Sequence, residues 1–206
     1  MSQFFYIHPD NPQARLLKQA VEIIRQGGVV VYPTDSGYAI GCQVGNKQAL
    51  EKICRIRALD MDHDFTLVCQ DVSELSVYAK VGNTSFRLLK NNTPGPYTFI
   101  FKATREVPRR LQNPKRKSIG IRIPNNTITL ELLKMLDEPL MSSSLILPGN
   151  DFAEADPEEI RDKLEHSVDL IIHGGILQET PTTVIDLYDE QPVVVRAGNG
   201  NTEPFE

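Results

Sequence analysis

Hydroxyl side chains recur where several predicted strands end, and arginines lie at other points along the chain. The hydroxyls are Thr34, Ser36, the serines 142–144, Thr182 and Thr183, and the arginines are Arg55, Arg57, Arg122 and Arg196. Hydroxyl groups and guanidinium forks both hydrogen-bond to carboxylates and phosphates. This set predicts a site that positions a substrate and neutralises its charge, without a side-chain nucleophile.

The first of these hydroxyls lies in the stretch 29–41, which reads VVVYPTDSGYAIG. Its β-branched and aromatic start predicts a buried strand, and Pro33, which lacks an N–H and has a fixed φ, is expected to end that strand. Thr34, Asp35 and Ser36 then have two interpretations. They fold back on their own backbone to cap a turn, or they face a ligand at the end of the strand, as in open α/β sheets.

The elements that must position these side chains alternate between helices and strands. Helices are expected over 12–26, 47–57, 71–79 and 127–137, with others through 86–89 and from Asp156, and strands over 65–69, 97–101, 118–124, 139–149, 168–172, 181–187 and 193–196. This interleaving predicts an α/β fold, and the closely spaced strands near the C-terminus favour a mixed sheet. The period of two in 118–124 places Gly120 and Arg122 on one face, either at a solvated edge or beside a gap that admits a ligand.

The composition is that of an ordinary globular protein, with 40% hydrophobic and 24% charged residues. A chain of 206 residues is most simply one domain, here 1–206. No apolar run approaches the roughly 20 residues of a membrane span, and the N-terminus lacks a basic region followed by an apolar one. We therefore expect a cytoplasmic protein with no membrane partner.

Several other classes of site find no support in the sequence. Cys42, Cys54 and Cys69 are scattered and lack CxxC spacing, so neither a disulfide framework nor a zinc site is indicated. The four histidines are isolated, and no protein-held metal is predicted. The motifs G-x-x-x-x-G-K-[ST], G-x-G-x-x-G and G-x-S-x-G are all absent, which argues against a P-loop, a Rossmann dinucleotide site and an α/β-hydrolase.

The net charge of −5 hides a basic segment at 102–117, KATREVPRRLQNPKRK. Against the single acid Glu106 it carries Lys102, Arg105, Arg109, Arg110, Lys115, Arg116 and Lys117. The segment is either a solvated surface loop or a local surface for nucleic acid.

Six motifs follow one another along the chain: PTDSGYAIG, PGPYTFIF, SIGIRIP, MSSSLILPG, TTVIDL and VVVRAG. From about Ala14 to Gly198 the sequence therefore resembles the YrdC/YciO family. The resemblance implies a twisted mixed sheet, flanked by helices, around a concave basic surface that binds ATP or AMP and RNA. The best-understood branch of the family makes threonylcarbamoyl-AMP from threonine, bicarbonate and ATP, releasing pyrophosphate, for a modified adenosine next to the anticodon of certain tRNAs.

The resemblance also implies roles for individual residues. The amino-acid substrate and bicarbonate would be bound by Thr34, Tyr38, Arg122 and Ser142, and the nucleotide by Arg55, Arg57, Ser144, Thr183 and Arg196. Arg122 would meet the substrate carboxylate, which suits its planar fork. ATP would enter as a substrate together with magnesium.

Two residues depart from the synthase branch. Arg55 stands where that branch has lysine, which keeps the charge but changes its reach. Ile146 replaces an asparagine and removes an amide donor and acceptor, at a cost of about 1–3 kcal/mol or tenfold to a hundredfold in affinity or rate. We therefore expect a nucleotidyltransferase with weak or altered synthase activity.

Two alternatives remain. In the first, the protein has lost catalysis and binds double-stranded RNA or tRNA through Arg109, Arg110, Lys115, Arg116 and Lys117. In the second, the nucleotidyl chemistry persists with another amino acid or as a hydrolytic reverse reaction.

Overall fold

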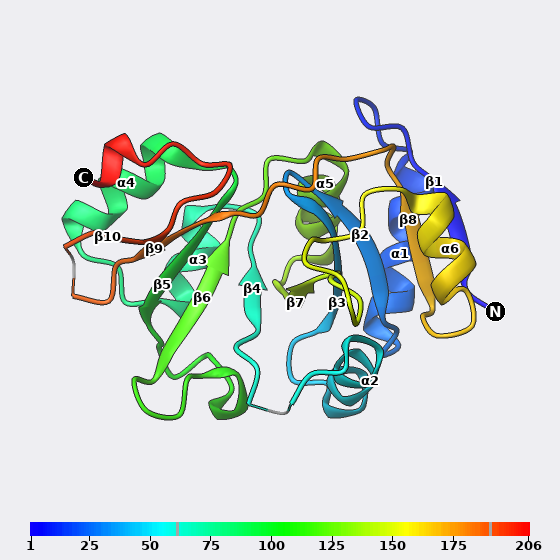
Figure 1. Cartoon of the computed structure of the whole chain (residues 1–206), viewed down its shortest axis with the longest axis horizontal. Helices are drawn as coiled ribbons and strands as arrows, with labels where there is room; N and C mark the ends of the chain where they lie inside the picture. The colour runs from blue at the N-terminus through cyan, green and yellow to red at the C-terminus, as the bar shows by residue number, and fades with distance from the viewer. Residues whose placement is uncertain (61, 190) are drawn as a thin grey trace.

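The computed structural model describes residues 1–60, 62–189 and 191–206. These residues form ten strands: β1 (Gln3–Tyr6), β2 (Val30–Thr34), β3 (Gly37–Gln43), β4 (Thr66–Val68), β5 (Tyr97–Lys102), β6 (Ser118–Arg122), β7 (Leu140–Ser144), β8 (Leu170–His173), β9 (Thr183–Asp186) and β10 (Val193–Arg196). They join in one sheet in the order β1-β8-β2-β3-β7-β4-β6-β5-β9-β10, with parallel and antiparallel pairs (Figure 1). The expected mixed α/β sheet is confirmed.

β2 continues through Pro33 and ends at Thr34, so the prediction that Pro33 ends this strand was wrong. Pro33 lies opposite Tyr38 of β3, and both backbone groups of Tyr38 bond away from β2. The nitrogen of Pro33 therefore faces the other side of the strand, where β8 pairs only with the start of β2. Because no strand of the described residues pairs with Pro33 on that side, the missing N–H costs the sheet no ladder hydrogen bond.

The chain turns after β2 and returns as β3, a strand that the sequence pattern did not predict. All but the last of its residues are buried, so it lacks the alternation that marks a half-buried strand. Gly37 opens β3 with a φ of +87°, and a Cβ there would lie 2.8 Å from the Cβ of Ala153. Only glycine meets both conditions at this turn. The edge strand β1 was also not predicted.

The helices agree closely with the predicted ones. They are α1 (Ala14–Arg25), α2 (Lys47–Arg57), α3 (Val72–Tyr78), α4 (Asn83–Asn92), α5 (Thr127–Leu136) and α6 (Pro157–Leu164), with short 3₁₀ turns at Arg109–Leu111 and Glu203–Phe205. Four begin after a side chain that accepts a hydrogen bond from a first-turn N–H, namely Asn46, Asp71, Asn126 and Asp156. α1 begins at Ala14 rather than Pro12 and has no such cap.

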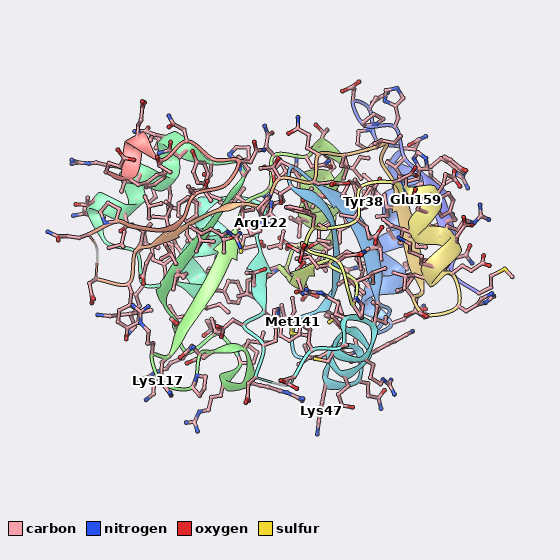
Figure 2. The ribbon with its side chains drawn as sticks, viewed as in Figure 1. Tyr38, Lys47, Lys117, Arg122, Met141 and Glu159 are labelled. Atoms are coloured by element: carbon pink, nitrogen blue, oxygen red, sulfur yellow. The ribbon has the colours of Figure 1, made fainter. Side chains whose placement is uncertain are left out.

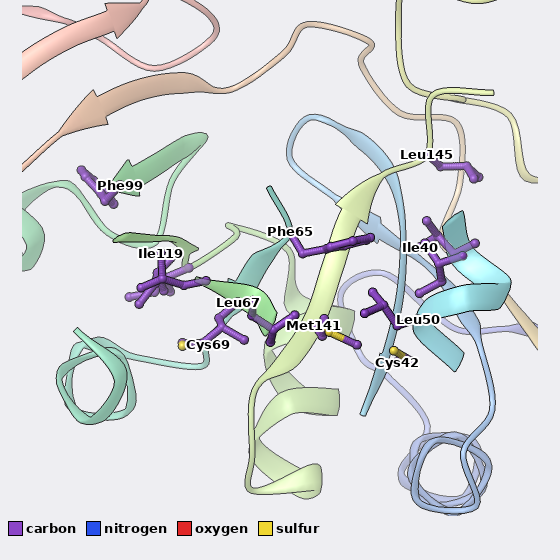
Figure 3. Packing of buried hydrophobic residues seen from close by; sticks show 14 of the residues in the cluster. Ile40, Cys42, Leu50, Phe65, Leu67, Cys69, Phe99, Ile119, Met141 and Leu145 are labelled. Carbon is purple, nitrogen blue, oxygen red and sulfur yellow. The ribbon is translucent and has the colours of Figure 1, made fainter. Parts of the chain in front are cut away.

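Buried hydrophobic side chains cover both faces of the sheet. α1 and α5 pack against Val30, Tyr32 and Leu140, and we call this side the α5 face. Residues of α2, α3, α4 and α6 belong to a larger cluster on the other side, the α2 face, which includes Ile40 and Met141 (Figure 3). In the described part of the chain, no helix is long and apolar enough to cross a membrane.

The three cysteines should be unreactive in the folded protein. All are buried, and burial raises the pKa of Cys42 to about 12 and also raises the pKa values of Cys54 and Cys69. Because the thiolate is the reactive form, we expect slow labelling by an aromatic disulfide reagent at pH 8 and rapid labelling of all three thiols in guanidinium chloride. Rapid labelling of the folded protein would contradict this packing.

Candidate ligand-binding site

A row of small and polar side chains continues the α5 face beyond the residues that pack against α1 and α5. Ser142 of β7 lies opposite Thr66 of β4, which in turn lies opposite Gly120 of β6. Alternate residues of a strand point to the same face, so Ser144 and Arg122 lie on this face as well. We call the set Ser142, Ser144, Thr66, Gly120 and Arg122 the polar row. Figure 2 shows Arg122 in the central part of the sheet, together with Met141 of the α2 face.

Gly120 lies beside a small cavity of about 140 Å³ on the polar row. A Cβ at this position would lie 3.1 Å from Cγ2 of Thr66 and 3.4 Å from Cγ2 of Thr98. Leu111, from the basic segment, also lines the cavity. The glycine therefore keeps space open on the sheet, as the second interpretation of Gly120 and Arg122 requires.

Arg122 brings a buried positive charge to this face. It is 5% exposed, and its Nη2 donates to Oδ1 of Asp35 at 2.6 Å. The other carboxylate oxygen accepts from the backbone N–H of Asn125 at 2.7 Å. Among the described residues, Nε of Arg122 is buried and has no hydrogen-bond partner. An unsatisfied buried donor costs about 1–3 kcal/mol, so one donor of this guanidinium is unused within the described residues.

The hydroxyls of Thr34 and Tyr38 make hydrogen bonds within the protein. Oγ1 of Thr34 donates to the carbonyl of Gly37 at 2.6 Å and accepts from the N–H of Ser36 at 3.0 Å. The Tyr38 hydroxyl donates to the carbonyl of Gly175 at 2.7 Å, and burial raises the pKa of Tyr38 to about 12. Thr34 thus holds the turn after β2 and Tyr38 holds the segment after β8, while their contact with a substrate stays a prediction.

Ser142 and Ser144 differ in their accessibility. Ser142 is buried against Tyr32, with the two hydroxyls in hydrogen-bond contact, and burial raises the pKa of Tyr32 to about 12. Ser144 is partly exposed, and in the described part of the chain its hydroxyl has no hydrogen-bond partner. Ser144 is therefore the serine of this run best placed to contact a ligand on the α5 face.

Arg57 contacts the middle serine of the run instead. Its Nη1 donates to Oγ of Ser143, and its Nε donates to the carbonyl of Ile146 at 3.0 Å. Nε2 of His63 lies 3.1 Å from the same Oγ. Strand alternation turns Ser143 to the α2 face, so Arg57 reaches the end of β7 from the side opposite Arg122. Ile146 follows Ser144 by two residues, so this hydrogen bond brings Arg57 to the segment that continues from the end of β7.

Arg196 lies at the other end of the polar row. Its Nη2 and Nε donate to the carbonyl of Thr182 at 2.7 and 3.2 Å. Oγ1 of Thr182 is 2.9 Å from Oγ1 of Thr98, which continues the row toward Gly120. Thr183 is fully buried and donates to the carbonyl of Gly200 at 2.7 Å. The geometry therefore favours Thr182, rather than the predicted Thr183, as the hydroxyl beside Arg196.

Arg55 does not join the polar row in this structure. It lines a separate cavity of about 640 Å³ together with Lys52 and Asp169, which form an ion pair at 3.1 Å. Positions two apart on a helix point to different sides, which separates Arg55 from Arg57. The contact of Arg55 with a nucleotide therefore stays a prediction, at a place apart from the polar row.

The five basic residues predicted to bind RNA are all exposed: Arg109, Arg110, Lys115, Arg116 and Lys117. Arg109 and Lys117 line a cavity of about 970 Å³, to which Lys80 and Arg105 also contribute. Arg116 is different, because its Nη1 donates to Oδ2 of Asp186 at 2.7 Å. Its charge is thus offset by a carboxylate, whereas Lys80 and Arg105 add cations that were not assigned to this surface from the sequence.

Four contributors to the site were not identified as functional residues from the sequence: Thr66, Thr98, Ser143 and His63. Thr98 is the polar residue of the otherwise apolar strand YTFIF, and this contrast could have identified it. Ser143 was noticed only as part of the serine run. For His63, an isolated histidine in a polar stretch, the sequence offers no comparable signal.

The sequence and the fold have counterparts in known proteins. The family model for Sua5, YciO and YrdC, described by the words "Telomere recombination", matches residues 22–198. The chain belongs to this family. It is 65% identical to YciO of Escherichia coli over the full length of both proteins, and the crystal structure of E. coli YciO superposes with a TM-score of 0.95.

More distant relatives extend the comparison. The threonylcarbamoyl-AMP synthase of Vibrio vulnificus is 27% identical over 85% of this chain and 95% of the synthase. The crystal structure of P. abyssi Sua5 complexed with L-threonine has a TM-score of 0.87 at 23% identity, covering 96% of this chain and 58% of Sua5. At this identity the Sua5 structure shows a shared fold.

His63 should make the stability of the protein depend on pH. Burial, and then the charge of Arg57, lower the pKa of His63 below its ordinary value of 6.5. The unfolded chain therefore binds a proton that the folded protein resists, and stability should fall as the pH drops below about 6.5.

The test is urea denaturation of the wild type and of His63→Gln between pH 7.5 and 5. The free energy of unfolding should fall less between pH 7.5 and 5 in the variant than in the wild type, because glutamine does not titrate. Identical pH profiles would show that His63 is not in this environment. His166→Gln, which changes an exposed histidine, is the matched control.

Proposed function

We propose that this protein is a nucleotidyltransferase of the threonylcarbamoyl-AMP synthase type, with weak or altered activity, linked to tRNA modification. The observation that carries the proposal is the buried guanidinium of Arg122, whose Nε has no partner among the described residues, on the same sheet face as the row leading to Arg196. A buried cation with unused donors suits a carboxylate. The 27% identity to a threonylcarbamoyl-AMP synthase supports the same reaction class.

The proposed substrates are an amino acid such as threonine, bicarbonate and ATP with magnesium. The amino group attacks the bicarbonate carbon and water leaves, which gives a carbamate. A carbamate oxygen then attacks the α-phosphorus of ATP, the bond to the β-phosphate oxygen breaks, and pyrophosphate leaves. Two structural relatives support these ligand classes: P. abyssi Sua5 is known complexed with L-threonine, and full-length HypF in a phosphate- and nucleotide-bound form.

In this proposal the side chains act by position and charge rather than as nucleophiles. Arg122 binds the carboxylate of the amino acid. Arg196, at one end of the polar row, and Arg57, which reaches the end of β7 from the α2 face, neutralise phosphate charge. Ser144, at the end of β7, offers a hydroxyl on the α5 face. Holding reactants in register and stabilising the charge on the leaving pyrophosphate are sufficient sources of rate for such a transfer.

Ile146 gives a physical reason for a weak activity. Its carbonyl accepts a hydrogen bond from Nε of Arg57 at 3.0 Å, an interaction that any residue type could supply. Its side chain cannot make the polar contact of the asparagine that stands here in the synthase branch. The change therefore weakens ligand binding rather than the placement of Arg57.

The reaction predicts pyrophosphate release that requires threonine, bicarbonate and ATP together. Arg122→Ala should lower kcat/KM for threonine about tenfold to a hundredfold, since it removes a charged hydrogen-bond donor. The assay is enzyme-coupled detection of pyrophosphate at high protein concentration. Arg87→Ala, on the exposed side of α4, is the matched control. Pyrophosphate release that does not depend on threonine, or an unchanged kcat/KM in Arg122→Ala, would contradict the proposal.

A second candidate function is RNA binding by the basic segment. The specific observation in its favour is the cavity of about 970 Å³ lined by Lys80, Arg105, Arg109 and Lys117, with Glu106 as the one acid among its lining residues. Exposed cations around a hollow suit successive backbone phosphates, largely without sequence preference. This surface is built from residues other than those of the polar row, so the two functions can be tested separately.

RNA binding should be strongly salt-dependent. We expect replacement of Arg109, Arg110, Lys115 and Lys117 by alanine to flatten the slope of log K against log salt by roughly 0.7–0.9 for each phosphate that the variant no longer neutralises. Fluorescence anisotropy with a short RNA duplex from 50 to 250 mM salt measures the slope. A control that replaces Lys18, Lys47, Lys90 and Lys134, which are exposed elsewhere, should keep it. Equal slopes in both quadruple variants would remove this function.

A further inference from the structure

We infer that Asp35 is a positioning residue that orients Arg122 for the carboxylate of the amino-acid substrate. The inference rests on the proposed function, because it names how one end of that substrate is received. From the sequence, Asp35 was expected either to cap its own turn or to face a ligand. The hydrogen bonds around the β2–β3 turn now distinguish these roles.

The turn is held without the side chain of Asp35. Oγ1 of Thr34 accepts from the N–H of Ser36 at 3.0 Å and donates to the carbonyl of Gly37 at 2.6 Å. Those two bonds close the turn through the threonine hydroxyl. The carboxylate of Asp35 is therefore available for partners outside the turn.

Both oxygens of Asp35 bind groups that lie about ninety residues further along the chain. Oδ1 accepts from Nη2 of Arg122 at 2.6 Å, and Oδ2 accepts from the backbone N–H of Asn125 at 2.7 Å. The side chains of the ion pair are 6% and 12% exposed for Arg122 and Asp35. Because Asn125 fixes the carboxylate from one side, the carboxylate in turn fixes the direction of the guanidinium.

The ion pair leaves donors of Arg122 for a ligand. The guanidinium is planar and carries five N–H donors in a rigid fork, so holding one nitrogen orients the other two. Asp35 engages Nη2 alone, and Nε is without a partner in the described part of the chain. A substrate carboxylate would then meet a guanidinium whose plane is already set, which lowers the ordering cost of binding.

The same ion pair could instead serve only to hold the β2–β3 turn against β6. The two roles differ in which measurement they change. A positioning role acts on the amino acid and depends on Arg122, whereas a purely structural role changes the stability and the binding of both substrates alike.

The test is a double-mutant cycle on Asp35 and Arg122, read by calorimetric titration of L-threonine and by the KM for ATP. Asp35→Ala should weaken threonine binding about tenfold or more and change the KM for ATP less than about twofold. In the Arg122→Ala background, Asp35→Ala should have no further effect on threonine. Asp169→Asn, which breaks the ion pair with Lys52 beside the separate cavity of about 640 Å³, is the matched control and should leave threonine binding unchanged.

Three results would overturn the inference: unchanged threonine binding in Asp35→Ala, an equal loss for threonine and ATP, or the same loss in the Arg122→Ala background. If Asp35→Ala does not fold, Asp35→Asn takes its place in the cycle. Asparagine keeps the size of the side chain and one acceptor oxygen. A wild-type protein that binds threonine, with loss in Arg122→Ala but none in Asp35→Ala, would leave the proposed function standing. A wild type that does not bind threonine would remove both.

Discussion

The register of the central strands is the constraint on which the site depends. β7, β4 and β6 pair so that Ser142, Thr66 and Gly120 form a line across the sheet. A shift of one residue in either pairing would turn every side chain of the shifted strand to the opposite face. A shift of β7 would take Ser144 from the α5 face. A shift of β6 would take Arg122 from it and point the unpaired donor into the hydrophobic cluster of the α2 face.

Burial of Arg122 sets the electrostatics of this face. A buried charge without a partner is strongly unfavourable, and Asp35 supplies that partner from the β2–β3 turn. The two residues lie far apart in sequence, so the ion pair also ties the hairpin to β6. A charge kept in a largely dry environment interacts with a ligand more strongly than the same charge in water, which suits recognition of a carboxylate.

In this member of the Sua5/YciO/YrdC family, the arginines predicted to bind the nucleotide do not all lie on one face of the sheet. Arg57 is tied to Ser143 and Ile146, and Arg55 faces a separate cavity. The two departures from the synthase branch thus lie in different elements: Arg55 is on α2, and Ile146 follows the end of β7. Arg122, Thr182 and Arg196 lie on or along the polar row.

The sequence alone determined the α/β class, the capped helices and most strands, because caps, turns and hydrophobic periodicity are properties of neighbouring residues. It also identified the hydroxyls and arginines from which the site is built. It did not determine that β2 passes through Pro33, since this depends on β8 pairing only with the start of β2. Nor did it determine that Ser143 faces Arg57, that Thr182 rather than Thr183 meets Arg196, or that Asp35 holds Arg122. Those choices depend on the register between strands distant in sequence, which only the tertiary structure decides.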